Sequence, residues 1–176
     1  MIESALTYRI PEAAWSIAFL GSALAEFSNY VQRGQWSKES VGQLYTRDLT
    51  SDEIAVEAVT KLAPRWANFS GVRFDPAKAA AERLEMFTNG FHFVGFWHSH
   101  PEKVPQPSAE DFRMAADHAA AAKPVLSGLI FVVVGTQPPP VGLGVWVHDG
   151  VSAWPAVPQL RKGTPVNASV RLLESK

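Results

Sequence analysis

Cysteine is absent from the 176-residue sequence, and its absence excludes several kinds of site. Disulfides, iron–sulfur clusters and zinc sites built on thiolates all require this residue. A small protein without disulfides fits a reducing compartment, so we expect the protein in the cytoplasm.

Surplus basic charge and long hydrophobic runs are also missing. Lys and Arg number 16 against 17 Asp and Glu, for a net charge of -1, whereas a protein that binds a phosphate backbone normally shows clustered basic residues. The longest apolar run, around 125–135, is shorter than the roughly 20 residues that cross a bilayer. The first residues, 1–4, lack the basic segment of a secretory signal. We therefore expect a soluble protein that binds neither nucleic acid nor membranes.

The composition is that of a globular protein, with 47% hydrophobic and 19% charged residues. A length of 176 residues suits one domain with a single core.

Pro11 and Glu12 suit the first turn of a helix. Apolar residues at alternating steps of three and four then predict an amphipathic helix to about Gln32; they are Ile17, Leu20, Leu24, Phe27 and Val31. Such a stripe also suits a coiled-coil seam or dimer surface, but packing onto a sheet is favoured.

Strands and helices alternate in the rest of the chain. Alternating or continuously apolar segments predict strands at 40–47, 52–62, 92–97, 129–134 and 144–148. Asp75 as a cap and Pro76 in the first turn predict a helix to about residue 87, which Asn89 and Gly90 end. Another helix is expected at 108–122, and the last fifteen or so residues are loosely patterned. The fold class is therefore α/β, with a mixed sheet flanked by three helices.

Two histidines stand where a predicted strand ends. His98 and His100 are two residues apart, so their side chains point to the same face of the strand. Two imidazoles on one face can share a tetrahedral metal ion. A His-x-His pair alone is more often made of ordinary surface or core histidines.

A second pattern follows after a short loop. Ser108 and Asp111 are three residues apart, which places both on one face of the first turn of the next predicted helix. Alone, this spacing indicates a capping box. If the turn folds back over the strand end, Asp111 joins His98 and His100 as a third ligand, which leaves a fourth position for water.

Together these residues resemble a known family. The stretch HSHPEKVPQPSAED resembles the signature of the JAMM (MPN+, JAB-domain) zinc metallopeptidases, and ESVGQL at 39–44 resembles the segment that carries their catalytic glutamate. The resemblance covers about residues 10–150. Thr46 departs from it, because many members have a glycine there. The implied architecture is the cytidine-deaminase-like MPN/JAB fold, in a single domain over 1–176.

The resemblance implies a site and a mechanism. One Zn²⁺ per chain would be held by His98, His100 and Asp111, and would lower the pKa of a bound water to about 7. Glu39 would serve as the general base, and Ser108 would donate a hydrogen bond to the oxyanion. Other acids suit the base less well: Glu110 points away from Asp111 around the helix, and Glu102 lies in the loop. His92, His118 and His148 have no partner at ligand spacing and are expected to be ordinary histidines.

The resemblance also implies a substrate class. Relatives typically cut the bond after the C-terminus of a ubiquitin-like modifier. Some compact bacterial members accompany activating-like and conjugating-like enzymes in antiphage operons, and others process sulfur-carrier proteins. We expect deconjugation or precursor processing. Two alternatives stay open: a RadC-type protein linked to DNA repair, whose loop usually differs from EKVPQ, and a non-catalytic MPN-type interaction module, which the complete ligand set disfavours.

Overall fold

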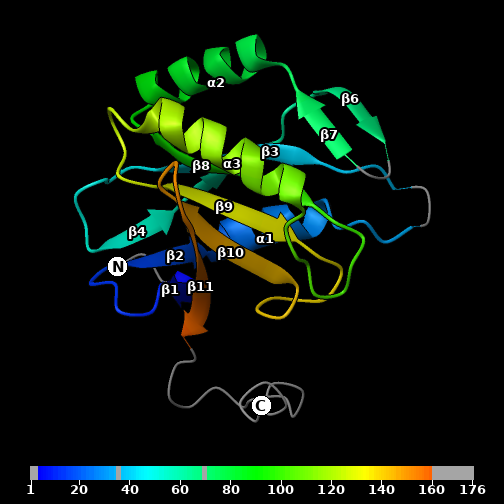
Figure 1. Cartoon of the computed structure of the whole chain (residues 1–176), viewed down its shortest axis with the longest axis horizontal. Coiled ribbons are helices and arrows are strands. Elements are labelled where there is room, and N and C mark those ends of the chain that lie inside the picture. Colours follow the sequence, from blue (N-terminus) through cyan, green and yellow to red (C-terminus); the bar gives the residue numbers. More distant parts are fainter. Residues whose placement is uncertain (1–3, 35–36, 69–70, 160–176) are drawn as a thin grey trace.

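A computed structural model describes residues 4–34, 37–68 and 71–159 of the chain. Its main feature is a nine-stranded sheet in the order β4-β2-β1-β11-β10-β9-β8-β3-β5 (Figure 1). The strands are β1 (Ser4–Arg9), β2 (Ser16–Leu20), β3 (Val41–Thr46), β4 (Glu53–Val56), β5 (Ala58–Val59), β8 (His92–Ser99), β9 (Leu129–Val134), β10 (Leu143–His148) and β11 (Ala153–Gln159). Because β8–β9 and β2–β4 pair in parallel and the other pairs are antiparallel, the sheet is mixed, as predicted.

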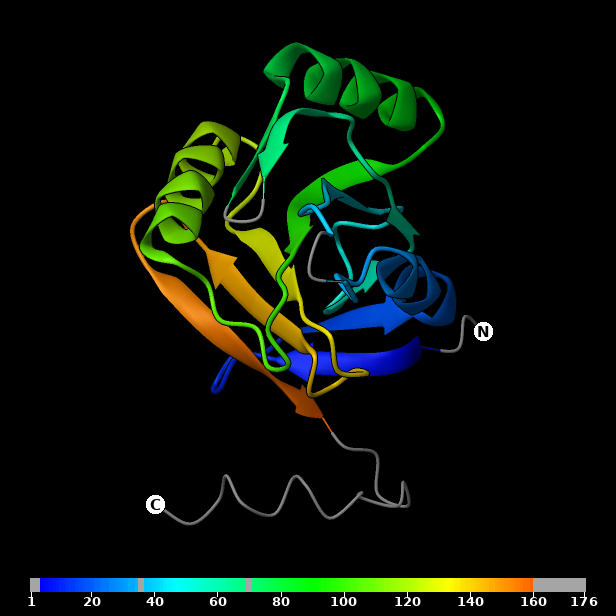
Figure 2. The ribbon, with the colours of Figure 1, turned by 90° about the vertical axis from the view of Figure 1, so that its right-hand side faces the viewer.

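The sheet curls strongly, because its two outermost strands are neighbours in the chain. β4 and β5 lie at opposite ends of the strand order, yet only Glu57 separates them. The backbone N–H of Glu57 donates to the carbonyl of Tyr45 on β3 at 3.0 Å. The sheet therefore bends until its edges approach each other, and Figure 2 shows this curvature from the side.

Helix α1 (Gly21–Asn29) packs inside the curl. Phe27 of α1 contacts Phe19 of β2 and Trp97 of β8 with ring centroids 5.9 and 5.6 Å apart. Trp97 is fully buried, stacks on Tyr30 and donates its indole N–H to the carbonyl of Thr60. The larger of the two main apolar clusters thus lies between α1 and the concave face of the sheet.

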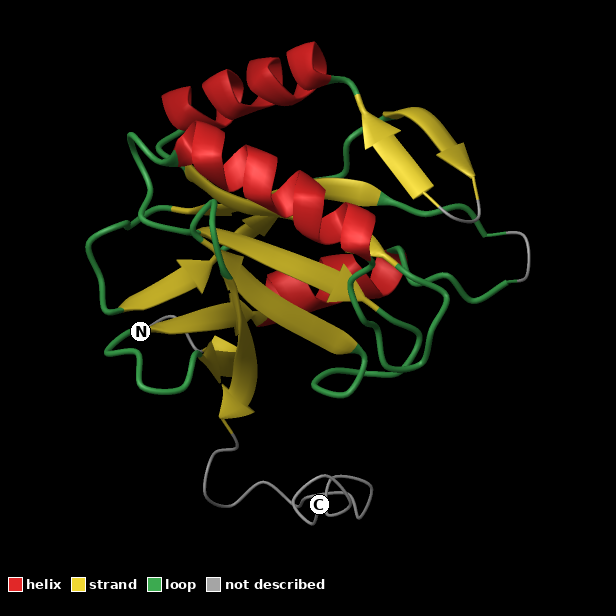
Figure 3. Ribbon diagram, viewed as in Figure 1, coloured by secondary structure: helices red, strands yellow, loops and turns green. Residues whose placement is uncertain are grey.

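The other two helices cover the opposite face (Figure 3). They are α2 (Pro76–Thr88) and α3 (Ala109–Ala122). Ala115 and Ala119 of α3 pack on Phe96 and Phe131 in a second buried cluster. A hairpin, β6 (Pro64–Asn68) with β7 (Gly71–Phe74), forms a separate two-stranded sheet. None of the helices in the described residues is long and apolar enough to cross a membrane.

The predicted helix from Pro11 to Gln32 is wrong in its first half. Residues 16–20 form β2, and Glu12 has a φ of 68°, outside the helical region. Ile17, Ala18 and Phe19 are all buried, because β2 lies between β1 and β4 with both faces covered. A strand buried on both faces shows no alternation of apolar and polar residues. The apolar residues of β2 therefore fit the helical spacing by coincidence. Only the part at Leu24 and Phe27 is helical.

Other predicted elements agree with the structure more closely. The helices at 76–87 and 108–122 and the strands at 40–47, 92–97, 129–134 and 144–148 appear within one or two residues of their predicted ends. The predicted strand 52–62 is divided into β4 and β5, which join opposite edges of the sheet. Strands β1 and β11 and the hairpin β6–β7 were not predicted. The last fifteen residues lie outside the described part of the chain.

Gly95 gives a test of the packing beneath the candidate site. A Cβ atom at this position would collide with the backbone carbonyl of Ile130 on the adjacent strand β9. We expect Gly95→Ala to lower the free energy of unfolding by about 3 kcal/mol, the upper end of typical overpacking costs. Gly21→Ala is the matched control, because a Cβ atom added there would have no neighbour within 4 Å. Chemical denaturation of both variants measures the difference, and equal stabilities would contradict this packing.

Candidate metal centre

The end of β8 places two histidines on the sheet face that α3 covers. His98 belongs to β8, and His100 follows its last residue, Ser99. His98 lies between Val41 of β3 and Val133 of β9, and the N–H of His100 donates to the carbonyl of Val134 at 2.8 Å. The backbone is thus paired on both sides at this point. The Nε2 atoms of His98 and His100 are 2.8 Å apart.

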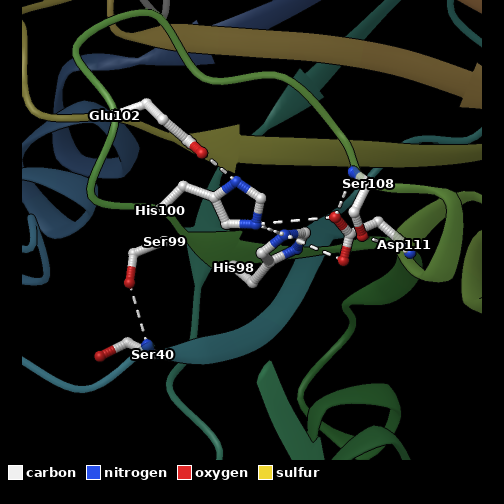
Figure 4. A network of polar contacts seen from close by, with 7 residues as sticks. All are labelled: Ser40, His98, Ser99, His100, Glu102, Ser108 and Asp111. Atoms are coloured by element: carbon white, nitrogen blue, oxygen red, sulfur yellow. Dashed lines mark hydrogen bonds and ion pairs between the residues drawn. The ribbon is translucent and has the colours of Figure 1, made fainter. Parts of the chain in front are cut away.

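The first turn of α3 supplies a carboxylate to the same place. Ser108 is the N-cap, and its Oγ accepts from the N–H of Asp111 at 3.2 Å, while Asp111 Oδ2 accepts from the N–H of Ser108 at 2.6 Å. This reciprocal pair is the predicted capping box. The same carboxylate reaches the histidines, with Oδ1 3.4 Å from His98 Nε2 and Oδ2 3.6 Å from His100 Nε2 (Figure 4).

These three side chains could hold one metal ion. Their potential ligand atoms all lie within 4.8 Å of one another, and they form the only such group found among the described residues. Zinc bonds of about 2.0–2.2 Å in a tetrahedron separate neighbouring ligand atoms by roughly 3.3 Å. The carboxylate–histidine separations of 3.4 and 3.6 Å fit this value, and the histidine pair at 2.8 Å is slightly closer. Two imidazoles and one carboxylate are a donor set suited to zinc.

His98 is held by packing. Its side chain is 1% exposed, and its ring stacks on Phe131 with centroids 5.2 Å apart. Burial is the largest influence on the pKa of His98 and lowers it, although the carboxylate of Asp111 opposes the shift. The imidazole is therefore kept neutral, which is the form that binds a metal. Its Nδ1 is buried and has no hydrogen-bond partner in the described residues.

His100 is held differently. Its Nδ1 lies 3.0 Å from Oε2 of Glu102, a residue of the loop between β8 and α3. An ionised carboxylate can only accept, so we assign the ring proton to Nδ1. The lone pair on Nε2 then faces His98 and Asp111. For Asp111 itself, burial favours the neutral acid, but hydrogen bonds from His98 and Ser108 prevail and lower its pKa.

Glu39 lies two residues before β3, the strand that pairs with β8. The N–H of Ser40 donates to Ser99 Oγ and the N–H of Ser99 donates to the carbonyl of Ser40, both at 2.9 Å. Val41 and His98 are the last partners in the antiparallel pair, and the contacts between Ser40 and Ser99 extend it by one residue toward Glu39 and His100. Because side chains alternate along an extended chain, we infer that Glu39 faces the side of the sheet that carries both histidines; the charges of Asp111 and Glu102 act on it there. Ser99 is thus a residue whose role the sequence did not reveal.

The surroundings of Glu39 disfavour its charge. The residue is 7% exposed. Burial, and then the negative charges of Asp111 and Glu102, raise the pKa of Glu39 from 4.5 to about 7. Three carboxylates therefore share this small region, and a bound cation would offset their mutual repulsion.

The structure also gives the positions of Ser108 and of the residues considered as alternative bases or ligands. Ser108 lies beside Asp111; among the described residues, no acceptor takes its hydroxyl proton, which stays free to donate. Glu110 is exposed on the first turn of α3. His92, His118 and His148 lie outside the group of potential ligands. Glu102, which the sequence placed only in a loop, contacts a candidate ligand.

We predict that the protein binds about one zinc ion per chain through His98, His100 and Asp111. The double variant His98→Ala/His100→Ala should lose this zinc, because two of the three ligands are removed. His92→Ala is the matched control and should keep it. Elemental analysis after reconstitution with zinc and removal of the excess measures the content. Full occupancy in the double variant would exclude the assignment.

A second prediction concerns the metal-free protein. The unfolded chain ionises Glu39 near its ordinary pKa of 4.5, whereas the folded chain retains the proton up to about 7. The folded state therefore loses stability as the pH rises between these values. Glu39→Gln has no ionisable group at this position, so its stability does not fall in this way. The difference in melting temperature between the variant and wild type should therefore grow from pH 4.5 to 7 and stay constant above pH 7. The exposed Glu85→Gln is the control, and a pH-independent difference at Glu39 would contradict the prediction.

Comparison with known proteins identifies the family of the chain. A family model described as prokaryotic homologs of the JAB domain matches residues 22–148, a range that includes Glu39, both histidines, Ser108 and Asp111. The solution structure of protein DSY2949 from Desulfitobacterium hafniense is 22% identical, with a TM-score of 0.60 over 79% of this chain and 88% of that chain; it supports the fold alone. No curated protein matches in sequence. The family match over most of the chain shows that this protein belongs to the prokaryotic JAB-domain homologues.

Proposed function

We propose that the protein is a zinc-dependent peptidase or isopeptidase of the cytosol that cleaves the bond after the C-terminus of a ubiquitin-like modifier. One observation carries the proposal. Two imidazole nitrogens and a carboxylate converge, and the buried Glu39, which precedes the neighbouring strand β3, lies within the influence of the Asp111 charge. Membership of the JAB-domain family supports a peptidase in particular.

The chain supplies the parts that hydrolysis requires. His98, His100 and Asp111 would hold the zinc, which when bound would supply Lewis acidity and make a water nucleophile available near neutral pH. Glu39 accepts the proton of the attacking water and delivers it to the leaving amine. Its position depends on the paired backbones of Ser40 and Ser99.

Ser108 serves the reaction as the oxyanion donor. Its oxygen already accepts the N–H of Asp111 as the helix cap, and this contact fixes where the hydroxyl lies. A hydroxyl both accepts and donates. The remaining O–H of Ser108 therefore donates to the oxygen that becomes negative when the scissile carbonyl is attacked.

The substrate reaches this centre as an extended chain. The outer edge of β3 beside the site is occupied, because Thr60 and Leu62 donate to the carbonyls of Gln43 and Val41 at 3.0 and 2.9 Å. Strand β7 of the hairpin lies close to β3, and within the described part of the chain β6 and β7 pair only with each other. We infer that the modifier tail adds as a strand to this hairpin. A bacterial system with activating-like and conjugating-like enzymes would produce such conjugates.

The role of Glu39 as the general base is tested by one substitution. Glu39→Gln should slow hydrolysis about 100- to 10000-fold, the typical contribution of a general base, while zinc content stays at the wild-type level. Single-turnover cleavage of a modifier fused to a reporter measures the rate. Near-wild-type turnover would make Glu39 a structural acid only.

The hydroxyl of Ser108 is tested by comparing Ser108→Ala with Ser108→Gly. Both should lower the rate about 100- to 1000-fold, because both lack the donor. Their stabilities should differ, since alanine at an N-cap costs about 1 kcal/mol and glycine only a few tenths. A rate loss that follows the melting temperature, and is small for glycine, would assign Ser108 to capping alone.

Substrate choice is tested with a series of tails. Replacing the terminal glycine of a ubiquitin-like modifier by a bulky residue should lower cleavage at least about 100-fold, because a main-chain-paired tail near the metal leaves little room for a side chain. Zinc content is measured in parallel as the control. Equal cleavage of unstructured peptides without a folded modifier would indicate a general peptidase.

A further inference from the structure

We propose that Glu102 is a positioning residue that orients His100 for metal binding from the loop between β8 and α3. The inference deepens the proposed function, on whose metal site it rests. No position of the His-x-His and Ser-x-x-Asp patterns includes Glu102. Its carboxylate nevertheless reaches His100 Nδ1, the ring nitrogen that points away from the ligand cluster, at 3.0 Å (Figure 4).

The contact determines which nitrogen of His100 can bind a metal. A carboxylate accepts and cannot donate, so the pair is formed only when Nδ1 carries the proton. Nε2 is then unprotonated, with its lone pair toward His98 Nε2 at 2.8 Å and Asp111 Oδ2 at 3.6 Å. Outer partners of this kind fix the tautomer and the ring orientation of metal-binding histidines.

His100 requires such a partner more than His98 does. The ring of His98 is enclosed by the core and stacks on Phe131, so packing alone fixes it. The side chain of His100 is 11% exposed and lies one residue beyond the end of β8. Among the described residues, the only ring it contacts is that of His98. A hydrogen bond from the loop therefore provides the orientation that packing does not.

The loop holds the backbone of Glu102 in place through hydrogen bonds and close packing. The carbonyl of Glu102 accepts from the N–H of Thr136 at 2.8 Å, and the carbonyl of Lys103 accepts from the N–H of Gln137. A Cβ atom at Gly135 would collide with the carbonyl of Glu102 and the ring of Pro105, so the loop lies directly against the chain after β9. The backbone of Glu102 is thus fixed although its side chain is 55% exposed.

A simple charge effect is the alternative explanation. Any carboxylate close to a bound cation would attract it without orienting a histidine. At an exposed position such an attraction contributes little. The two explanations differ for glutamine, which removes the charge but retains an oxygen that accepts from Nδ1. They also differ in salt, because a charge effect at an exposed position is screened.

The test is zinc affinity, measured by competition with a chelator of known affinity. Glu102→Ala should weaken zinc binding about 10- to 100-fold, the usual effect of losing an outer partner. Glu102→Gln should stay within a few-fold of wild type, and Lys103→Ala, an exposed residue of the same loop, should equal wild type. Equal zinc affinity of Glu102→Ala and wild type would overturn the inference. It would also be overturned if Glu102→Gln weakened zinc binding as much as Glu102→Ala and high salt removed both effects.

A second readout does not depend on metal. NMR spectra of the ¹⁵N-labelled imidazole rings in the metal-free protein should place the ring proton of His100 on Nδ1 in wild type and in Glu102→Gln. In Glu102→Ala the proton should move in part to Nε2, while His98 is unchanged. A His100 tautomer that is indifferent to Glu102→Ala would overturn the inference even if zinc affinity fell. Failure of the proposed function is distinct: wild type would bind zinc but cleave no modifier fusion.

Discussion

Strand β8 is hydrogen-bonded on both sides, and the position of the whole candidate site follows from that pairing. Its antiparallel partner β3 and its parallel partner β9 fix the backbone of His98 and His100. Gly95 permits the close approach of β8 to β9, because any side chain there would meet the carbonyl of Ile130. A one-residue shift of register would turn both histidines to the opposite face, toward α1. The register is thus the constraint on which the metal centre depends.

Asp111 connects helix formation to the site. Its carboxylate accepts the N–H of the N-cap Ser108 and also faces both histidine Nε2 atoms. A carboxylate at this position is favourable with or without a metal, because it meets the unsatisfied N–H groups and the positive end of the helix dipole. The capping box therefore prepares the carboxylate for metal binding, and the two interpretations of the Ser108–Asp111 spacing are compatible.

Short-range patterns predicted most of what positions the site, and long-range pairing was harder to foresee. The histidine spacing and the Ser108–Asp111 cap depend on neighbours within a few residues, so the sequence alone indicates them. The position of Glu39 depends on how β3 pairs with β8, and it was inferred only from family resemblance. In the structure Glu39 is buried near the charges of Asp111 and Glu102, but its catalytic role and that of Ser108 stay predictions.

The misassigned and overlooked parts have physical reasons. Ile17 and Phe19 were placed on a helix because β2 is covered on both faces and so lacks the alternation of a half-buried strand. The contribution of Ser99 and Glu102 lies in tertiary contacts of a hydroxyl and a loop carboxylate, which leave no periodic signal.

The most direct measurement of the central claim is anomalous X-ray diffraction at the zinc absorption edge from crystals of the zinc-loaded protein. The account predicts one strong peak per chain, about 2.0–2.2 Å from Nε2 of His98, Nε2 of His100 and a carboxylate oxygen of Asp111, with a fourth position open to solvent. A peak bound elsewhere on the chain, or coordination through Nδ1 of His100, would contradict it.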